Sequence, residues 1–166
     1  SDSAEVEDIS RKFKINFVRR NKSLAEDRTK IEDVLIDLSK QLITDGFSHI
    51  VLLQATSPCT SPLIVDQCIQ IAIDTNCDTV ITGYINSHFH PSLLFKESSE
   101  GSVKWLMKSE ITKRRQEFSP FLIRCGCCYV VKIDSLLAKR SLYGNTIKYL
   151  KVDPIHAVNI DQESDI

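Results

Sequence analysis

The segment from residue 50 to residue 58 joins a continuous apolar run to a polar turn, and it reads Ile-Val-Leu-Leu-Gln-Ala-Thr-Ser-Pro. Such a run is typical of a strand buried on both faces, and ligands of open α/β sheets lie beyond the carboxyl ends of strands. Gln54 offers a donor and an acceptor there, which suits a base or a sugar hydroxyl. Thr56 and Ser57 could equally cap the next helix, so a ligand site and a helix cap both stay open.

A second candidate is the basic run Lys113-Arg114-Arg115-Gln116, which is followed nine residues after Arg115 by Arg124. Guanidinium groups can bind a carboxylate or a phosphate through two parallel hydrogen bonds. The run is also compatible with an ordinary solvated group of charges. The pattern therefore indicates an anion site without excluding the simpler interpretation.

A third candidate lies near the end of the chain, where a predicted strand over 156–160 runs into Asp161. Residues two apart on a strand point to the same face, so Asn159 and Asp161 could direct two oxygen ligands at one hard cation. Mg²⁺ prefers such oxygens and keeps several waters and substrate phosphates. An ordinary turn at the end of a strand explains the same two residues.

Helical and strand-like patterns alternate along the chain and would position these residues. Apolar spacings of three and four predict helices over 4–13 and 31–42, the second ending at Asp45-Gly46, and a helix starting at Ser61-Pro62. A further short helix is predicted over 135–140. Predicted strands cover 14–19, 49–54, 78–85, 127–133, 146–152 and 156–160. This alternation predicts a single α/β domain over 1–166 with a largely parallel sheet.

The region 86–121 departs from this pattern. Short strand candidates at 93–96 and 103–107 are separated by Ser, Glu and Gly, and the basic run follows them. We interpret 86–121 as an insertion, either a lid or an oligomerisation arm.

Composition and charge restrict the function classes. The chain has 166 residues, 42% of them hydrophobic, and a net charge of −1, so no global field favours nucleic acid or an acidic membrane. No apolar run approaches the ~20 residues that span a bilayer, and the acidic start is unlike a signal peptide. Three of six cysteines fall within 125–128, which suggests either a soft-metal site or, as we prefer, reduced thiols packed as small hydrophobes in a cytoplasmic protein.

Several segments, in order, resemble motifs of the acylneuraminate (CMP-sialic acid) cytidylyltransferases. Residues 51–58 resemble L-L-Q-P-T-S-P, Arg115-Gln116 with Pro120 resemble R-Q-x-x-P, residues 124–129 resemble R-P-N-G-A-I-Y, and 158–161 with Asp165 resemble V-D-I-D-x-x-x-D. Residues 1–6 are similar to the family's T-D-S-x-E-I. The resemblance covers essentially the whole chain.

The resemblance implies a three-layer, Rossmann-like nucleotidyltransferase fold with an inserted dimerisation arm over 86–121. It also implies a homodimer that transfers CMP from CTP to a sialic acid or related nonulosonic acid and releases pyrophosphate. Asp161 and Asn159 would bind Mg²⁺, and Asp161 and Arg115 would be the catalytic residues. The sugar-binding residues would be Gln54, Thr56, Ser57, Arg115, Gln116, Arg124 and Tyr129.

Departures from the family pattern concern activity. The family's glycine-rich nucleotide loop lies upstream of the point where this sequence begins. Asn159 stands where the family usually has an aspartate, Cys125 replaces an asparagine, and Leu93 stands where a lysine is expected, with Lys96 nearest. A catalytically inactive homologue that binds sugar acid or nucleotide is therefore the alternative. Transfer to the eight-carbon sugar acid of lipopolysaccharide is disfavoured, since that family has Q-G-D-E-P at residues 54–58.

Overall fold

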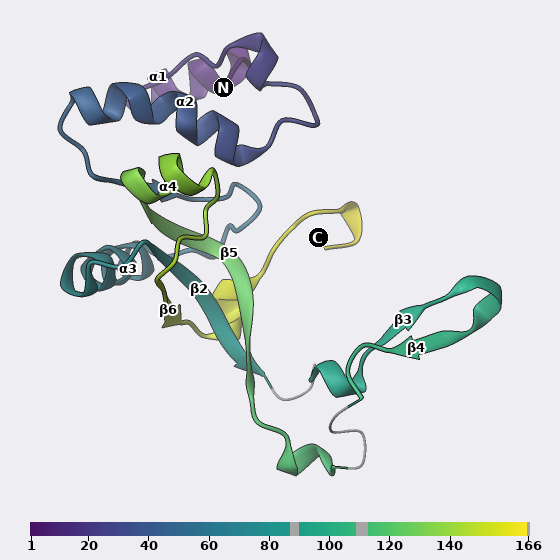
Figure 1. Cartoon of the computed structure of the whole chain (residues 1–166). Coiled ribbons are helices and arrows are strands. Elements are labelled where there is room, and N and C mark those ends of the chain that lie inside the picture. The colour runs from purple at the N-terminus through teal and green to yellow at the C-terminus, as the bar shows by residue number, and fades with distance from the viewer. Residues whose placement is uncertain (87–89, 109–112, 166) are drawn as a thin grey trace.

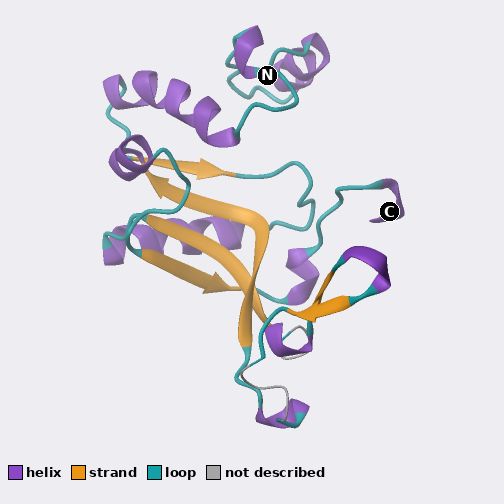
Figure 2. Cartoon of the chain, turned by 45° about the vertical axis from the view of Figure 1, so that its right-hand side comes forward, coloured by secondary structure: helices purple, strands orange, loops and turns teal. Residues whose placement is uncertain are grey.

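A four-stranded sheet forms the centre of the molecule, with the strand order β1-β5-β2-β6 (Figures 1 and 2). The computed structural model describes residues 1–86, 90–108 and 113–165, without the side chains of Ser99 and Arg115. The strands are β1 (His49–Leu52), β2 (Thr79–Asn86), β5 (Phe121–Lys132) and β6 (Ile147–Lys151).

The sheet is mixed. The strand β5 runs antiparallel to both β1 and β2, whereas β2 and β6 pair in parallel. Three of the four strands thus share one direction, with β5 inserted against them. The α/β class is confirmed, but the parallel part of the sheet is smaller than the sequence predicted. In the described part of the chain only β2 and β6 form a parallel pair.

Helices cover both faces of the sheet, which gives three layers (Figure 1). The helix α3 (Pro62–Thr75) covers one face, while α2 (Ile31–Thr44) and α4 (Ile133–Lys139) lie over the other. The helix α1 (Ala4–Lys12) lies beyond α2 and buries no residue. The core of the α3 face is rich in small residues, including Cys68, Ala72 and Val80, and that of the opposite face contains Tyr129 and Leu136.

The ends of the two long helices follow from local sequence. Ser61 caps α3, because its hydroxyl accepts a hydrogen bond from the Ile64 amide at 3.4 Å, and Pro62 occupies the first helical position. The helix α2 ends before Gly46, whose φ of +85° suits glycine. Both boundaries agree with the prediction from the sequence.

Two predicted strands are not formed. The segment 14–19 bonds to the N-terminus instead of a strand, through the Ser1 amino group and the Val18 carbonyl at 3.0 Å. The segment 156–160 begins inside a 3-10 helix (Pro154–Ala157), which Asp153 caps and Pro154 begins. The other 3-10 helices cover Lys22–Leu24, Pro91–Leu93, Ser99–Gly101, Arg115–Glu117 and Glu163–Asp165.

The described residues 90–108 project from the body and carry a two-stranded hairpin of β3 (Phe95–Glu97) and β4 (Val103–Trp105) (Figure 1). Every residue of these two strands is exposed. At the base of this projection His90 is buried and stacks on Phe118, with ring centroids 4.2 Å apart. The interpretation of 86–121 as an inserted lid or oligomerisation arm stays a prediction.

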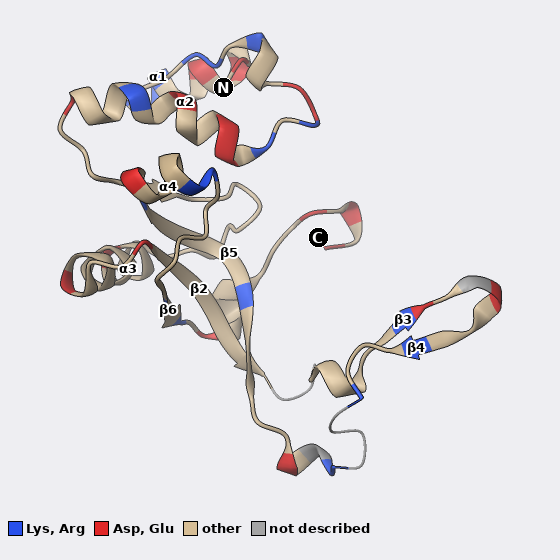
Figure 3. Ribbon diagram, viewed as in Figure 1, with Lys and Arg blue, Asp and Glu red and all other residues tan. Residues whose placement is uncertain are grey.

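Charge is distributed unevenly over these parts. Charged residues gather on α1, α2 and the projecting region, and the strands in the middle of the sheet carry few (Figure 3). Among the described residues, no helix is both long enough and apolar enough to cross a membrane.

Candidate active site

An irregularity in β5 shapes the site. Ile81 of β2 pairs with Tyr129, but the next residue, Thr82, pairs with Cys125, so residues 126–128 form a three-residue bulge. The buried Thr82 hydroxyl lies 3.3 Å from the carbonyl oxygens of Cys125 and Cys128, and it accepts a hydrogen bond from the Cys128 amide at 3.2 Å. The Thr82 hydroxyl thus provides a hydrogen-bond partner for main-chain groups of β5 where the regular strand pairing is interrupted.

The bulge lies against the turn that follows β1. Gly126 meets the side chain of Gln54 so closely that a Cβ at residue 126 would collide with the Gln54 amide oxygen. The same Cβ would lie 3.1 Å from the Ser57 hydroxyl oxygen. A glycine is therefore required for the close approach of Gln54, and the Thr60 hydroxyl fixes the turn further by donating to the Cys127 carbonyl at 3.2 Å.

Arg124 lies on β5 just before the bulge, and two tyrosine hydroxyls bind its guanidinium group. The Nη1 atom donates to the Tyr129 hydroxyl at 2.5 Å and to the Tyr143 hydroxyl at 2.7 Å. Its Cζ atom is 5.9 Å from each ring centroid. Tyr129 is buried, and this burial raises the pKa of its hydroxyl. The pair of hydroxyls holds the Arg124 side chain in place beside β5.

The C-terminal segment supplies the acidic group. The Asn159 amide donates to a carboxylate oxygen of Asp161, and both side chains are exposed. The Ile160 amide donates to the Thr56 carbonyl at 2.8 Å, and Asn159 Oδ1 lies 3.5 Å from the Ser57 hydroxyl. Asp165 accepts from the Asp161 amide at 2.9 Å. These contacts bring Asp161 to the turn after β1 although the predicted strand is not formed.

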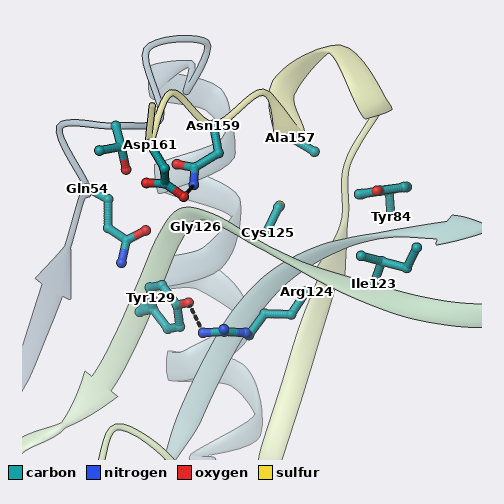
Figure 4. Close-up of a pocket in the computed structure, with 11 residues that line it drawn as sticks. Gln54, Tyr84, Ile123, Arg124, Cys125, Gly126, Tyr129, Ala157, Asn159 and Asp161 are labelled. Atoms are coloured by element: carbon teal, nitrogen blue, oxygen red, sulfur yellow. Dashed lines mark hydrogen bonds between the residues drawn. The ribbon is translucent and has the colours of Figure 1, made fainter. Parts of the chain in front are cut away.

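The turn after β1, the bulged part of β5 and the C-terminal segment together enclose one cavity of about 380 Å³ (Figure 4). In this view Asn159 and Asp161 lie on one side of Gly126, and Arg124 with Tyr129 lies on the other. Arg124 and Asp161 are the two charged residues of its lining, which makes the cavity polar at both ends. The lining consists of Gln54, Thr56, Tyr84, Ile123, Arg124, Cys125, Gly126, Tyr129, Ala157, Asn159 and Asp161.

The structure brings most of the predicted site residues together. Six of them line the cavity. Ser57 does not line it, but its hydroxyl lies 3.5 Å from Oδ1 of Asn159, which does. Gln116 lies in the 3-10 helix Arg115–Glu117, is exposed, and does not line the cavity. The side chain of Arg115 lies outside the described part of the structure. The predicted roles of all these residues stay predictions.

Tyr143 was missed by the sequence analysis. It follows α4 in a connection that reads Leu142-Tyr143-Gly144, and its side chain is exposed. A tyrosine next to a glycine in a loop is a weak signal, and only the bond to Arg124, nineteen residues away, indicates a part in the site.

The cysteines pack mainly as small apolar residues. All six are free thiols, and five are buried, including Cys68, Cys127 and Cys128. Burial raises the pKa of the Cys127 thiol to about 11, which keeps it protonated at neutral pH. Within the described ranges, no three His, Cys, Asp or Glu side chains gather in a way that could hold a metal ion.

Comparison with known proteins finds a weak similarity to a cytidylyltransferase. No family model matches the chain. The chain is 22% identical to the N-acylneuraminate cytidylyltransferase A of Danio rerio over 165 residues, which is 99% of this chain. That alignment covers 38% of the relative, so the chain spans well under half the length of the curated protein it matches.

Proposed function

We propose that the cavity binds a sialic acid or related nonulosonic acid, and that the chain takes part in transferring CMP from CTP to it, with release of pyrophosphate. The observation that carries this proposal is the meeting of Gln54, Arg124, Tyr129 and Asp161 in one cavity. These residues come from three separate segments that resemble cytidylyltransferase motifs, since Arg124 and Tyr129 lie in the same one. The similarity to the curated cytidylyltransferase supports the same chemistry.

The chemistry of the lining supports an acidic, polyhydroxylated ligand. Arg124 would bind the sugar carboxylate, since a guanidinium group can donate two parallel hydrogen bonds to it. Gln54 and Thr56 offer donors and acceptors for hydroxyl groups. A volume of about 380 Å³ lies within the usual range of small-molecule sites, and it would accommodate one sugar acid.

Asp161 and Asn159 would hold Mg²⁺ through a carboxylate oxygen and an amide oxygen, both of them hard ligands. When bound, Mg²⁺ would offset charge on the triphosphate and activate the attacking anomeric hydroxyl. Asn159 now donates its amide N–H to Asp161, so it would have to turn its oxygen toward the cation. The two residues fit a weak Mg²⁺ site that depends on substrate phosphates for its other ligands.

Arg115 and Gln116 would act from the projecting region 86–121. Gln116 does not line the cavity of its own chain. In a homodimer these residues would reach the cavity of the other copy, and the exposed hairpin would form part of the contact.

A catalytically inactive binding homologue is the second candidate. The hydrogen bond from the Asn159 amide to Asp161 favours it, because a donor occupies a carboxylate that the metal would need. Such a protein would bind the sugar acid without turnover.

The test has two parts. Calorimetry measures the binding of N-acetylneuraminate and its methyl ester, and a coupled assay measures pyrophosphate release from CTP with the sugar acid and Mg²⁺. We expect Arg124→Met to weaken sugar-acid binding at least tenfold, since a hydrogen bond to a charged group contributes about 1.5–3 kcal/mol. Arg11→Met, on the exposed helix α1, is the control.

Binding with pyrophosphate release supports cytidylyl transfer. Binding without release across several nonulosonic acids supports the inactive homologue. Absence of binding, or equal affinities of the acid and its ester, would overturn the proposal for this cavity.

A further inference from the structure

The connection between α4 and β6 holds Tyr143 firmly against the sheet. A carboxylate oxygen of Asp78, next to β2, accepts from the amides of Asn145 at 2.7 Å and Thr146 at 2.9 Å. The buried Thr79 hydroxyl donates to the Leu142 carbonyl at 2.7 Å. The ends of the connection are thus bonded to β2, and Tyr143 has a fixed place beside β5.

Close packing restricts the same connection. A Cβ at Gly144 would collide with the Asp78 side chain and would lie 2.5 Å from the Ser135 hydroxyl oxygen of α4. The Gly144 amide also lies 3.3 Å from the Thr79 hydroxyl oxygen. The residue after Tyr143 therefore has no room to move toward α4 or β2, and the tyrosine ring is directed over Arg124.

The two tyrosine hydroxyls use one nitrogen of the guanidinium group. Nη1 carries two N–H bonds, and it donates to Tyr129 at 2.5 Å and to Tyr143 at 2.7 Å. The other guanidinium nitrogens of Arg124 donate no hydrogen bond to any residue that the structure describes. The Nη2 and Nε edge is thus the part that is available for an oxyanion, and two fixed hydroxyls set its direction.

We propose that Tyr143 is a positioning residue, which together with Tyr129 aims the second edge of Arg124 into the cavity and so selects ligands that carry a carboxylate. Two hydroxyls from different segments fix a long side chain better than one, because each removes rotational freedom from the arginine. Tyr143 acts through Arg124 and not by touching the reacting atoms. The identity of the ligand rests on the proposed function, whereas the positioning of Arg124 does not.

The first experiment observes Arg124 without any ligand. In ¹⁵N-labelled protein, the Nε–Hε resonance of Arg124, assigned with Arg124→Lys, reports the environment and motion of the guanidinium group. We expect Tyr143→Phe to shift this resonance and to increase its fast motion, with an unchanged thermal midpoint. The matched control is Tyr149→Phe on β6, an exposed tyrosine with no bond to Arg124. An unchanged Arg124 resonance in Tyr143→Phe would overturn the positioning role.

The second experiment tests selection. We expect Tyr143→Phe to weaken binding of N-acetylneuraminate about 5- to 10-fold and to leave the affinity of its methyl ester unchanged. In an Arg124→Lys background the same substitution should have little effect, because Lys lacks the second donor edge. An equal loss for acid and ester would overturn carboxylate selection. Absence of binding to the unaltered protein would overturn the proposed function and the selection with it, while the Arg124 resonance would still decide the positioning role.

Discussion

The two walls of the cavity are built in different ways. The sheet wall, residues 123–129 of β5, includes the buried residues Cys125 and Tyr129, and it pairs with β2 on both sides of the bulge and with β1 at Tyr129. The C-terminal wall, residues 157–161, has exposed side chains at Asn159 and Asp161 and belongs to no strand. The sheet wall therefore determines the shape of the cavity, and the C-terminal wall contributes a carboxylate that can adjust to a ligand.

The difference matches the two roles that we propose for Arg124 and Asp161. A cation that must recognise one carboxylate geometry benefits from a fixed frame, since preorganised groups lose little freedom on binding. A metal ligand that meets substrate phosphates benefits from adjustment. Arg124, held by two hydroxyls, is on the first kind of wall, and Asp161 is on the second.

The largest effect should come from removing the side chain that supports the bulge. Thr82→Val preserves the shape but leaves the Cys128 amide and two carbonyl oxygens without their hydroxyl partner. We expect a loss of about 2 kcal/mol in the free energy of unfolding, because unsatisfied buried groups cost about 1–3 kcal/mol. Urea denaturation measures this loss. Thr44→Val, in the exposed end of α2, is the control and should change stability by less than about 0.5 kcal/mol.

A smaller effect is expected when the bulge is filled. Gly126→Ala forces the Gln54 side chain out of its present place, which should weaken sugar-acid binding about tenfold. The loss of stability should be only about 1 kcal/mol, since Gln54 is exposed and can move. Calorimetry on Gly126→Ala, Gln54→Ala and the double variant tests this. Fully additive losses of affinity would show that Gly126 does not act through Gln54.

The sequence predicted which residues would lie together better than it predicted their geometry. Gln54, Arg124, Tyr129 and Asp161 line one cavity, and each was singled out because it lies in a short segment that resembles a cytidylyltransferase motif. The bulge was not predictable, since an extra three residues on β5 are visible only against the register of β2. The extent of the parallel pairing was overestimated because the sequence does not show that β5 runs antiparallel to β1 and β2.

In the C-terminal segment, Asn159 and Asp161 lie close together as predicted, but the strand that was predicted to bring them together is not formed. Asn159 and Asp161 were paired as alternate residues of a strand, yet they meet through an amide–carboxylate hydrogen bond in an irregular segment. Pro154 begins a 3-10 helix there, and the bond from Ile160 to Thr56 replaces a strand ladder. Apolar alternation over five residues cannot distinguish these two backbones.

The pH dependence of the sheet wall should depend partly on Asp78, which holds the connection that carries Tyr143. A hydrogen bond from the Thr146 amide is the main cause that lowers the pKa of Asp78 below its usual value. Its stabilising effect is therefore complete above the ordinary aspartate pKa of about 3.9, and it is lost as pH falls through the lower folded-state pKa. Asp78→Asn should be less stable than the unaltered protein at pH 7, and the difference should shrink below pH 4.

Urea midpoints measured from pH 7 down to pH 2 check this difference. Asp37→Asn, on the exposed face of α2 beside Lys40, is the matched control. A difference between Asp78→Asn and the unaltered protein that stays constant over this range would contradict a stabilising charge at residue 78.

The smallest effect on stability is expected from Asn159→Asp, which also tests the C-terminal wall most directly. The substitution removes the amide that donates to Asp161 and puts two carboxylates side by side, which should cost about 0.5 kcal/mol or less at this exposed position. Mg²⁺ should reverse that loss, because a second charged oxygen ligand strengthens binding of a hard cation. Asn159→Ala removes the same amide without adding charge, and its thermal midpoint should not respond to MgCl₂. If the midpoints of Asn159→Asp and Asn159→Ala rise equally with MgCl₂, Asp161 and its neighbour are not a metal site, and the C-terminal wall contributes only hydrogen bonds to the cavity.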